Sequence, residues 1–303
     1  MGKTLLIILI VLFVLYCVFI GFFFFVDFDR KFKIPMEKLM NPDGVQEMYR
    51  RKDTILSWPM QEVRITSYDG LQLYGRYFHQ SDSKRLLIMC HGWKSKWYAD
   101  FSTHVLWFYE NQCDLLIIDE RACGESEGRF VTFGIKERRD IAAWAEWASR
   151  NQKLPVYLYG TSMGAASVLM SADLSSDFAS GIVADSPFTQ PYTELRDFAK
   201  RMLHIPEYPF LPSLNLLCRL ILKEDLRHTD AEEILKKSRI PVIIFHGAKD
   251  WFCSVSMSER VRDMNLPNVD TYIYDDCGHC GSYTHHEEEY KHALMDLFSG
   301  TGD

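Results

Sequence analysis

The pattern Gly-Thr-Ser-Met-Gly at residues 160–164 constrains this chain more than any other short segment. It follows the apolar run at residues 155–159 and precedes a helix-forming stretch at residues 165–170. A strand, a sharp turn and a helix in this order hold Ser162 above the end of a sheet, and the flanking glycines let the backbone turn that tightly. Such a serine can attack a carbonyl carbon if the chain also supplies a base, an acid and an oxyanion-binding site. Alone, the pattern is modest evidence, because glycine-rich surface turns produce it by chance.

Strands and helices alternate along the chain after residue 60. Two segments of alternating polarity, residues 62–67 and 71–79, flank Asp69-Gly70 and predict a hairpin. Further strands are predicted at residues 85–90, 113–119, 155–159, 180–184, 240–245 and 270–274, and helices at residues 99–111, 135–151 and 290–298. A hairpin followed by strand-helix alternation predicts an α/β fold with a mostly parallel, doubly wound sheet.

The segment at about residues 189–238 interrupts this alternation with two or three predicted helices. Helices inserted between two strands would form a cap over the carboxyl edge of the sheet. The cap is rich in apolar residues, namely Phe198, Met202, Leu211, Leu214, Leu217, Leu220 and Ile221. They indicate an apolar substrate pocket, and the alternative that they only pack the cap onto the body stays open.

An unbroken apolar run at residues 5–26 opens the chain. At about 1.5 Å per helical residue it is long enough to cross the hydrocarbon core of a bilayer. A cleaved signal peptide is the alternative, but its apolar core is shorter and ends in small residues, whereas this run ends in four phenylalanines at residues 22–25. We therefore predict a transmembrane anchor at residues 1–28, a linker at 29–60 and a catalytic domain at 61–300.

The predicted location is the cell membrane, with a single span. Lys3 precedes the run, and Arg30, Lys31, Lys33 and Lys38 follow it, so the positive charges favour a cytoplasmic catalytic domain. An anchor at the extreme N-terminus can also translocate a whole domain despite modest flanking charge. The side of the membrane therefore stays open.

Charge and cysteine usage exclude several other classes. The net charge of −7 and the lack of a basic stripe argue against a nucleic-acid partner. The eight cysteines have irregular spacing, which is not typical of a secreted disulfide framework. Cys277-x-x-Cys280 is a weak zinc motif, because no second pair of ligands lies nearby in the sequence. The histidines at residues 285–286 do not complete a zinc-protease motif. We therefore expect no metal and no organic cofactor. A minor alternative is a reversible Cys277–Cys280 disulfide that displaces His279.

Two residues downstream are candidates for the base and the acid. His279 follows the last predicted strand, at the same sheet edge as Ser162. Asp250 follows the penultimate strand and could hold the imidazole in the tautomer that leaves its far nitrogen free. The rival acids are Asp185, Asp275 and Asp276, and the position of the loop favours Asp250.

The oxyanion site needs two backbone N–H groups. One should belong to Met163, which follows the serine, and the other to Trp93, in the loop that opens His91-Gly92-Trp93 after the strand at residues 85–90. Each donor of this kind lowers the barrier by about 3 kcal/mol. His91 is expected to order this loop rather than to react.

Together these elements resemble the α/β-hydrolases over roughly residues 60–300. The matching motifs are His91-Gly92, Asp119-x-Arg121-x-x-Gly124-x-Ser126-x-Gly128, residues 160–164, His246-Gly-x-x-Asp250 and Gly278-His279. The chain is most similar to the serine aminopeptidase-like and monoglyceride-lipase-like members, especially membrane-anchored bacterial ones, and Thr132-Phe133-Gly134 is part of that likeness. The resemblance implies the α/β-hydrolase fold, and loops braced by Asp119 and Arg121. The cysteines on either side of His279 depart from the family pattern.

We therefore expect a serine hydrolase of the carboxylesterase or lipase type. Ser162, His279 and Asp250 would cleave ester bonds of small or hydrophobic acyl substrates through an acyl-enzyme. The expected partners are a small-molecule acyl substrate and the lipid bilayer around residues 5–26. Two alternatives stay open, a serine aminopeptidase or amidase acting on short peptides, and a catalytically idle, membrane-tethered binding module.

Overall fold

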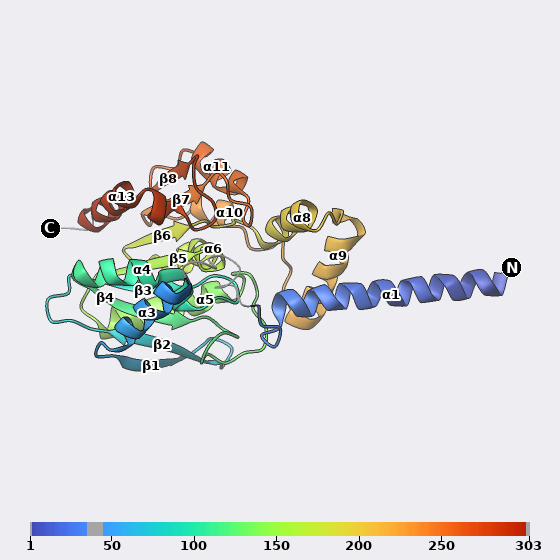
Figure 1. Cartoon of the computed structure of the whole chain (residues 1–303), viewed down its shortest axis with the longest axis horizontal. Helices are drawn as coiled ribbons and strands as arrows, with labels where there is room; N and C mark the ends of the chain where they lie inside the picture. Colours follow the sequence, from blue (N-terminus) through green and yellow to red (C-terminus); the bar gives the residue numbers. More distant parts are fainter. Residues whose placement is uncertain (1, 35–44, 301–303) are drawn as a thin grey trace.

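A computed structural model describes residues 2–34 and 45–300, and its centre is an eight-stranded sheet (Figure 1). The strands are β1 (Gln61–Thr66), β2 (Gln72–Phe78), β3 (Arg85–Cys90), β4 (Cys113–Asp119), β5 (Val156–Thr161), β6 (Gly181–Asp185), β7 (Val242–Gly247) and β8 (Val269–Tyr274). Their spatial order is β1-β2-β4-β3-β5-β6-β7-β8. The pairs β1–β2 and β2–β4 are antiparallel and the rest are parallel, which confirms the predicted mostly parallel, doubly wound sheet.

Helices cover both faces of the sheet, because the central strands are apolar on both sides. On one face, α4 (Trp97–Glu110) and α13 (Glu287–Ser299) share an apolar core with Leu87 and Met89 of β3, among others. On the opposite face, α5 (Glu137–Asn151), α6 (Met163–Met170) and α11 (Val255–Asp263) share a second apolar core with Leu86 and Ile88. The short helices α7 (Ala172–Ser175) and α12 (Ser282–His285) complete the body. Because the strands from β3 to β8 are parallel, their carboxyl ends all lie at the same edge of the sheet.

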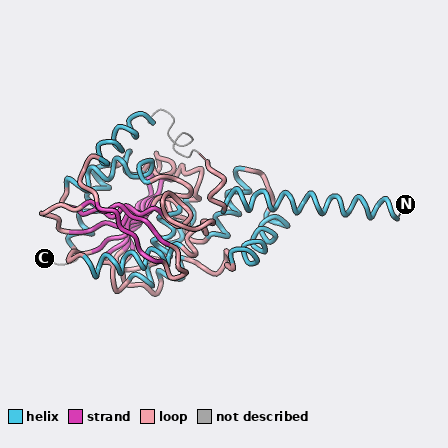
Figure 2. Tube along the Cα trace, turned by 90° about the horizontal axis from the view of Figure 1, so that it is seen from below, coloured by secondary structure: helices cyan, strands magenta, loops and turns pink. Residues whose placement is uncertain are grey.

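The cap lies between β6 and β7, as the sequence predicts. It consists of α8 (Pro191–Met202), α9 (Glu207–Leu217), the π-helical turn η1 (Cys218–Leu222) and α10 (Ala231–Leu235). Helices α8 and α9 project from the body towards the N-terminal helix (Figures 1 and 2). Leu211 and Leu214 are buried, whereas Met202, Leu220 and Ile221 are exposed. The apolar residues of the cap therefore serve more than one purpose, and not all of them line a pocket.

The first helix, α1 (Gly2–Phe28), is long and apolar enough to cross a membrane by length and composition. Its first half extends away from the rest of the molecule (Figure 1). Its second half packs on the protein, where Phe24 and Phe28 are completely buried and contact Phe130 and Phe133.

Within the predicted linker at residues 29–60, α3 (Val45–Leu56) packs against α4. Arg30, just after α1, donates hydrogen bonds to three carbonyl oxygens in residues 124–128. The segment that follows the apolar helix is therefore joined to the body on both sides of residues 35–44. The division of the chain at residues 28 and 60 stays a prediction.

Candidate active site

Ser162 lies at the turn between β5 and α6, with φ 54° and ψ −119°. This positive φ is strained for a residue with a side chain, and such strain is common at functional turns. The glycines of the motif are needed for close packing. A Cβ on Gly160 would lie 2.4 Å from the Gly164 carbonyl oxygen, and one on Gly164 would lie 2.1 Å from the Cys90 carbonyl oxygen. The sequence pattern therefore corresponds to a backbone path that only glycine allows at these two positions.

The fold brings Ser162, His279 and Asp250 into contact, although they are far apart in the sequence. His279 Nε2 lies 3.0 Å from Ser162 Oγ, and His279 Nδ1 lies 2.6 Å from Asp250 Oδ2. The rival acids have other surroundings. Asp276 contacts His286, the buried Asp185 accepts a hydrogen bond from Ser186, and Asp275 is exposed. The order and spacing of the three groups are those that general-base activation of a serine requires.

Asp250 is held by more than His279. Its Oδ1 accepts the backbone N–H groups of Phe252 and Cys253, each at 2.8 Å. Its Oδ2 also contacts His246 Nε2 at 3.1 Å, and His246 is oriented by Ser258. Burial alone would raise the pKa of Asp250, but the charge of His279 and these hydrogen bonds lower that pKa well below its usual range. The carboxylate is therefore ionised whenever the site is folded near neutral pH.

Two opposing effects set the protonation of His279. Burial disfavours the imidazolium, while negative charge at Cys280 and Asp250 favours it, and the net result is a raised pKa of His279. Cys277 and Cys280 are both free thiols. Cys277 packs in the core under β7, and the Cys280 backbone N–H donates to Ser186 Oγ at 2.9 Å. The Cys277–Cys280 redox hypothesis stays a prediction.

The loop after β3 passes directly beside Ser162. A Cβ on Gly92 would lie 3.2 Å from Ser162 Cβ, so the two backbones approach closely. The backbone N–H groups of Trp93 and Met163 have no hydrogen-bond acceptor among residues 2–34 and 45–300. Both predicted oxyanion donors are therefore unoccupied donors next to the serine. His91 accepts the Glu120 backbone N–H at 3.2 Å, which agrees with an ordering role for His91.

Asp100, in the first turn of α4, fixes this loop and was not predicted from the sequence. Its Oδ2 accepts the Gly92 N–H at 2.6 Å, and its Oδ1 accepts the Ser95 hydroxyl at 2.6 Å. An acidic residue in the first turn of a helix that follows a glycine-containing loop is the signal that could have identified it.

Arg121 braces a second loop through Asp140 and Asp69, at 2.6 Å and 2.9 Å.

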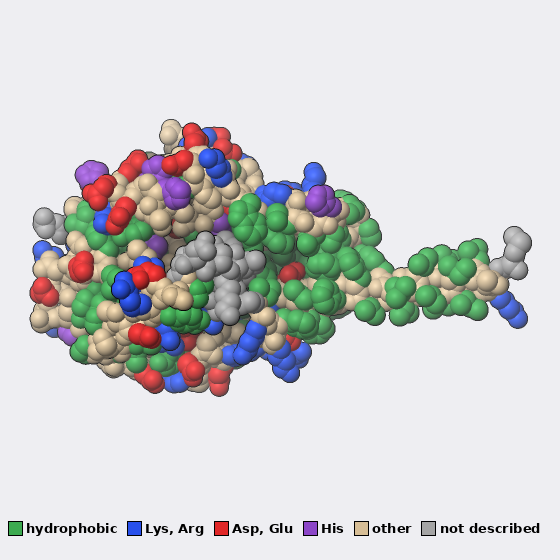
Figure 3. All heavy atoms as spheres, in the orientation of Figure 1, with side chains coloured by type: hydrophobic (Ala, Val, Ile, Leu, Met, Phe, Trp, Pro, Cys, Tyr) green, Lys and Arg blue, Asp and Glu red, His purple; other side chains and the backbone are tan. Residues whose placement is uncertain are grey.

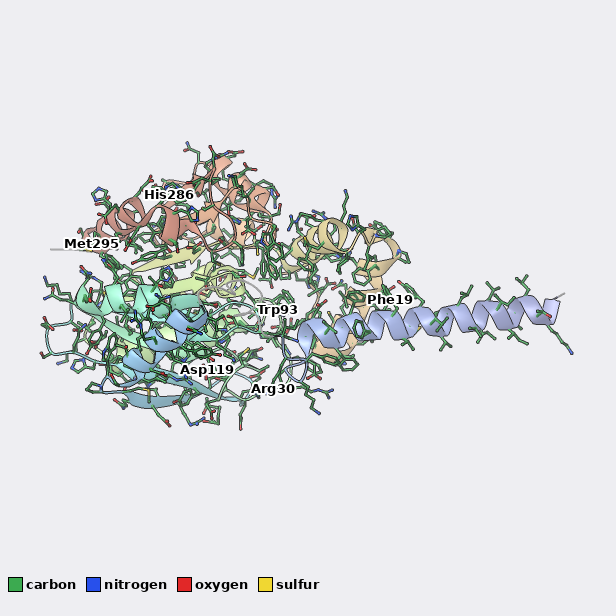
Figure 4. The ribbon with its side chains drawn as sticks, viewed as in Figure 1. Phe19, Arg30, Trp93, Asp119, His286 and Met295 are labelled. Carbon is green, nitrogen blue, oxygen red and sulfur yellow. The ribbon has the colours of Figure 1, made fainter. Side chains whose placement is uncertain are left out.

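The same loop also holds the end of α1. The Trp93 indole N–H donates to the Asp27 carbonyl oxygen at 2.8 Å (Figure 4 labels Trp93 between the body and the base of α1). The Lys94 ammonium donates to the carbonyl oxygens of Val26, Asp29 and Phe32, at 2.5, 2.8 and 3.2 Å. These carbonyls stand at and after the C-terminus of α1, where helical carbonyls lack partners and favour a cation.

Two cavities meet at Ser162. One is about 400 Å³ and mixes polar and apolar walls, including Arg51, Asp100 and His104. The other is small and apolar, and it is lined by residues of the cap and of the body together with the end of α1: Asp27, Trp93, Phe133, Phe188, Glu194, Leu195, Phe198 and Phe252. Among the apolar cap residues noted in the sequence, Phe198 is the one that lines this small cavity. Burial raises the pKa of Glu194 to about 8, so this carboxyl is mostly neutral near pH 7.

Over the part of the chain that the structure describes, no group of three or more His, Cys, Asp or Glu side chains is arranged to hold a metal ion. The groups around Ser162 can support acid-base and nucleophilic chemistry. These groups are a serine next to an imidazole, a carboxylate that contacts the imidazole, and two backbone donors near the serine.

Comparison with known proteins indicates a hydrolase fold. Residues 81–223 match the family described as serine aminopeptidase, S33. The chain is 24% identical over 242 residues to the uncharacterized protein YqkD of Bacillus subtilis, covering 79% of each chain. Among solved structures it is similar to the esterase Pf2001 of Pyrococcus furiosus, with a TM-score of 0.65, 24% identity and coverage of 82% and 94% of the two chains.

A second solved structure is the α/β hydrolase GrgF of a Penicillium species, with a TM-score of 0.63, 17% identity and coverage of 80% and 99%. A third is Est1E of Butyrivibrio proteoclasticus, solved with ferulic acid, with a TM-score of 0.59, 19% identity and coverage of 79% and 98%. The chain therefore has the α/β-hydrolase fold, its residues 81–223 match the serine aminopeptidase family, and it is a serine hydrolase.

Proposed function

We propose that this serine hydrolase cleaves carboxylic ester bonds of small or hydrophobic acyl substrates through Ser162, His279 and Asp250. The observation that carries the proposal is the unbroken chain of contacts from Asp250 Oδ2 through the His279 ring to Ser162 Oγ. His279 Nε2 accepts the hydroxyl proton as Ser162 Oγ attacks the carbonyl carbon, and returns it to the leaving group. Water then attacks the acyl-enzyme, with His279 again acting as the base.

The Trp93 and Met163 N–H groups bind the oxyanion of the tetrahedral intermediate in this scheme. They have no other acceptor in the described part of the chain, which supports the role, because a donor without a partner is available when charge develops beside it. The small apolar cavity beside Ser162 is suited to an alkyl group of the substrate. The larger cavity can take the other side of the ester.

Amide cleavage in short peptides is the second candidate, and the match to the serine aminopeptidase family favours it. A peptidase that recognises a free amine needs a carboxylate near the nucleophile. Asp100 is the nearest such group in the larger cavity, but the Gly92 N–H and the Ser95 hydroxyl already occupy both of its oxygens. Glu194 is neutral near pH 7. Neither Asp100 nor Glu194 is therefore a ready partner for a substrate amine, which favours esters. A catalytically idle binding module is a weaker candidate, since the serine, imidazole and carboxylate are all in contact.

We also propose that α1 is a retained, single membrane span that fixes the enzyme to the cell membrane. Its length and apolar composition support this, and so does the packing of Phe24 and Phe28 into the protein, because a cleaved signal peptide would leave these sites bare. The side of the membrane stays open. Alkaline extraction of membranes and an intact mass that includes residues 1–28 would support the anchor, and release of a chain lacking them would contradict it.

A panel of substrates tests the activity. The purified full chain should hydrolyse p-nitrophenyl esters and should cleave aminoacyl p-nitroanilides much more slowly. Ser162→Ala should abolish ester hydrolysis, whereas Ser176→Ala, which changes an exposed serine on the body, should leave it intact. Faster cleavage of the anilides would favour the peptidase, and ligand binding without turnover of either class would favour the idle module.

A further inference from the structure

The outer side of the cap next to α1 exposes large apolar side chains. Tyr208 is 71% exposed, Leu216 52%, Leu220 58% and Ile221 43%. Figure 3 shows an apolar surface that continues from the cap onto α1 without a polar band between them. Apolar patches of this kind on a protein surface mark sites of interaction.

The cap helix α9 packs directly on α1. The Phe210 ring centroid lies 5.9 Å from that of Phe19 and 5.2 Å from that of Phe23. The Tyr16 hydroxyl donates to Ser213 Oγ at 2.9 Å. Ser213, Leu216 and Leu220 follow an i, i+3, i+7 pattern, which places the two leucines on about the same side of the helix as the contact with α1.

The length of α1 determines the depth of these contacts in a bilayer. A span needs about 20 residues to cross a hydrocarbon core of about 30 Å. Any stretch of about 20 residues within Gly2–Phe28 contains residues 9–21. Tyr16 and Phe19 therefore lie within the hydrocarbon wherever the span is centred, and α9, which contacts both residues, must lie at the same depth.

We propose that α9 and η1 enter one leaflet of the bilayer beside α1, with Tyr208, Leu216, Leu220 and Ile221 in contact with lipid acyl chains. The proposal rests on the proposed retention of α1 as a membrane span. Its surface is continuous with α1. Apart from a kink at Tyr208, its backbone is helical, as a lipid-exposed backbone must be. The cap is then the face of the catalytic domain that meets the membrane.

The charges around this surface fit the same orientation. Arg219, Lys223 and Arg201 are exposed on the cap, and Lys31 and Lys33 are exposed just after α1. Long basic side chains at a membrane boundary extend towards the headgroups while their stems stay in the apolar layer. Anionic headgroups would therefore strengthen the docking of the cap.

Site-specific photo-crosslinking tests the proposal on the full chain. Benzoylphenylalanine is placed at Leu216 or Leu220, and the protein is reconstituted into bilayer discs that contain a phospholipid with radiolabelled acyl chains. Leu12, in the first half of α1, is the positive control. Leu174 and Met295 are matched negative controls, since they are 40% and 37% exposed apolar residues on the body. Figure 4 shows Met295 at the end of the molecule opposite to α1. Labelling by a fluorophosphonate verifies that each variant is folded.

The expected result is lipid adducts at Leu216 and Leu220 in yields comparable to Leu12 and at least about fivefold above Leu174. Adducts at Leu12 combined with yields at Leu216 and Leu220 no higher than at Leu174 would overturn the docking and leave the anchor intact. Crosslinks to a second copy of the chain at these positions would also overturn it. A lack of adducts at Leu12 would overturn the anchor and the docking together.

Discussion

The two sides of Ser162 are supported by different parts of the molecule. On the base side, His279 and Asp250 stand on loops at the carboxyl edge of the sheet, and the hydrogen bonds that orient their side chains come from the body. On the oxyanion side, the loop of Gly92, Trp93 and Lys94 is held from the body by Asp100 and from outside by the end of α1. Among the described residues, the base side has no hydrogen bond to the anchor helix, whereas the oxyanion side is hydrogen-bonded to it. Changes on the two sides should therefore have different consequences.

The largest effect is expected for the nucleophile and the base themselves. Ser162→Ala and His279→Ala should each lower kcat by about 10,000-fold or more, because the acyl-enzyme cannot form without them. Membrane association should not change, since the variants leave α1 and its hydrogen bonds to Trp93 and Lys94 as they are. Ester hydrolysis in detergent and recovery in the membrane fraction measure the two properties. Retention of a tenth of the activity by either variant would contradict the proposed roles.

Asp250→Asn should be nearly as damaging and should also move the pH profile. The base must be neutral, so activity rises with pH as the His279 imidazolium loses its proton. Negative charge at Cys280 and Asp250 raises the pKa of His279, so removing the Asp250 charge should lower that pKa and shift the acid limb of kcat/KM to lower pH. A pH-rate profile from pH 5 to 9 measures this shift. Asp276→Asn, at an exposed residue paired with His286, is the control that should leave the profile unchanged.

A smaller effect is expected on the oxyanion side when its connection to α1 is cut. Lys94→Met removes three hydrogen bonds to carbonyls at the end of α1. The loop should then position the Trp93 N–H less well, so kcat should fall about 10- to 100-fold while KM changes little. Lys84→Met, at an exposed lysine before β3, is the matched control. Equal kcat values for the two variants would show that the oxyanion side does not depend on α1.

The smallest expected effect is a change in the free energy of unfolding caused by Glu194 in the cap. The Glu194 carboxyl ionises near pH 4.5 when unfolded and at about pH 8 when folded, because burial disfavours its charge. The unfolded state therefore loses this proton first, and the fold is progressively destabilised as the pH rises between these two values. Glu194→Gln should remove this loss and stabilise the protein by up to about 3 kcal/mol at pH 7, with almost no change at pH 4. Thermal unfolding at both pH values measures the difference, and an equal gain at both would contradict the explanation.

The sequence predicted the base side better than the oxyanion side, for a physical reason. Parallel strands bring their carboxyl ends to one edge, so the loop after each strand locates Ser162, Asp250 and His279 without knowledge of the packing. His246 is part of the motif His246-Gly-x-x-Asp250, but the motif does not show that His246 supports Asp250. Only the contact between His246 Nε2 and Asp250 Oδ2 at 3.1 Å shows this.

The contacts of α1 could not be predicted in this way. The bonds from Trp93 and Lys94 to residues 26–32 join segments that are more than 60 positions apart, and no periodicity in either segment records them. The cap shows the same limit. Its apolar residues predicted a pocket, yet Leu220 and Ile221 are exposed, because an apolar side chain can face a core, a cavity or a lipid with the same composition.

The most direct test of the account is to locate the residue that reacts with a fluorophosphonate in the full chain. Peptide mapping by mass spectrometry should find one adduct, on Ser162, in the wild type and in Lys94→Met, with slower labelling in the variant. His279→Ala should label very slowly and Ser162→Ala not at all. An adduct on another residue, or equal labelling of Ser162→Ala and the wild type, would contradict the account.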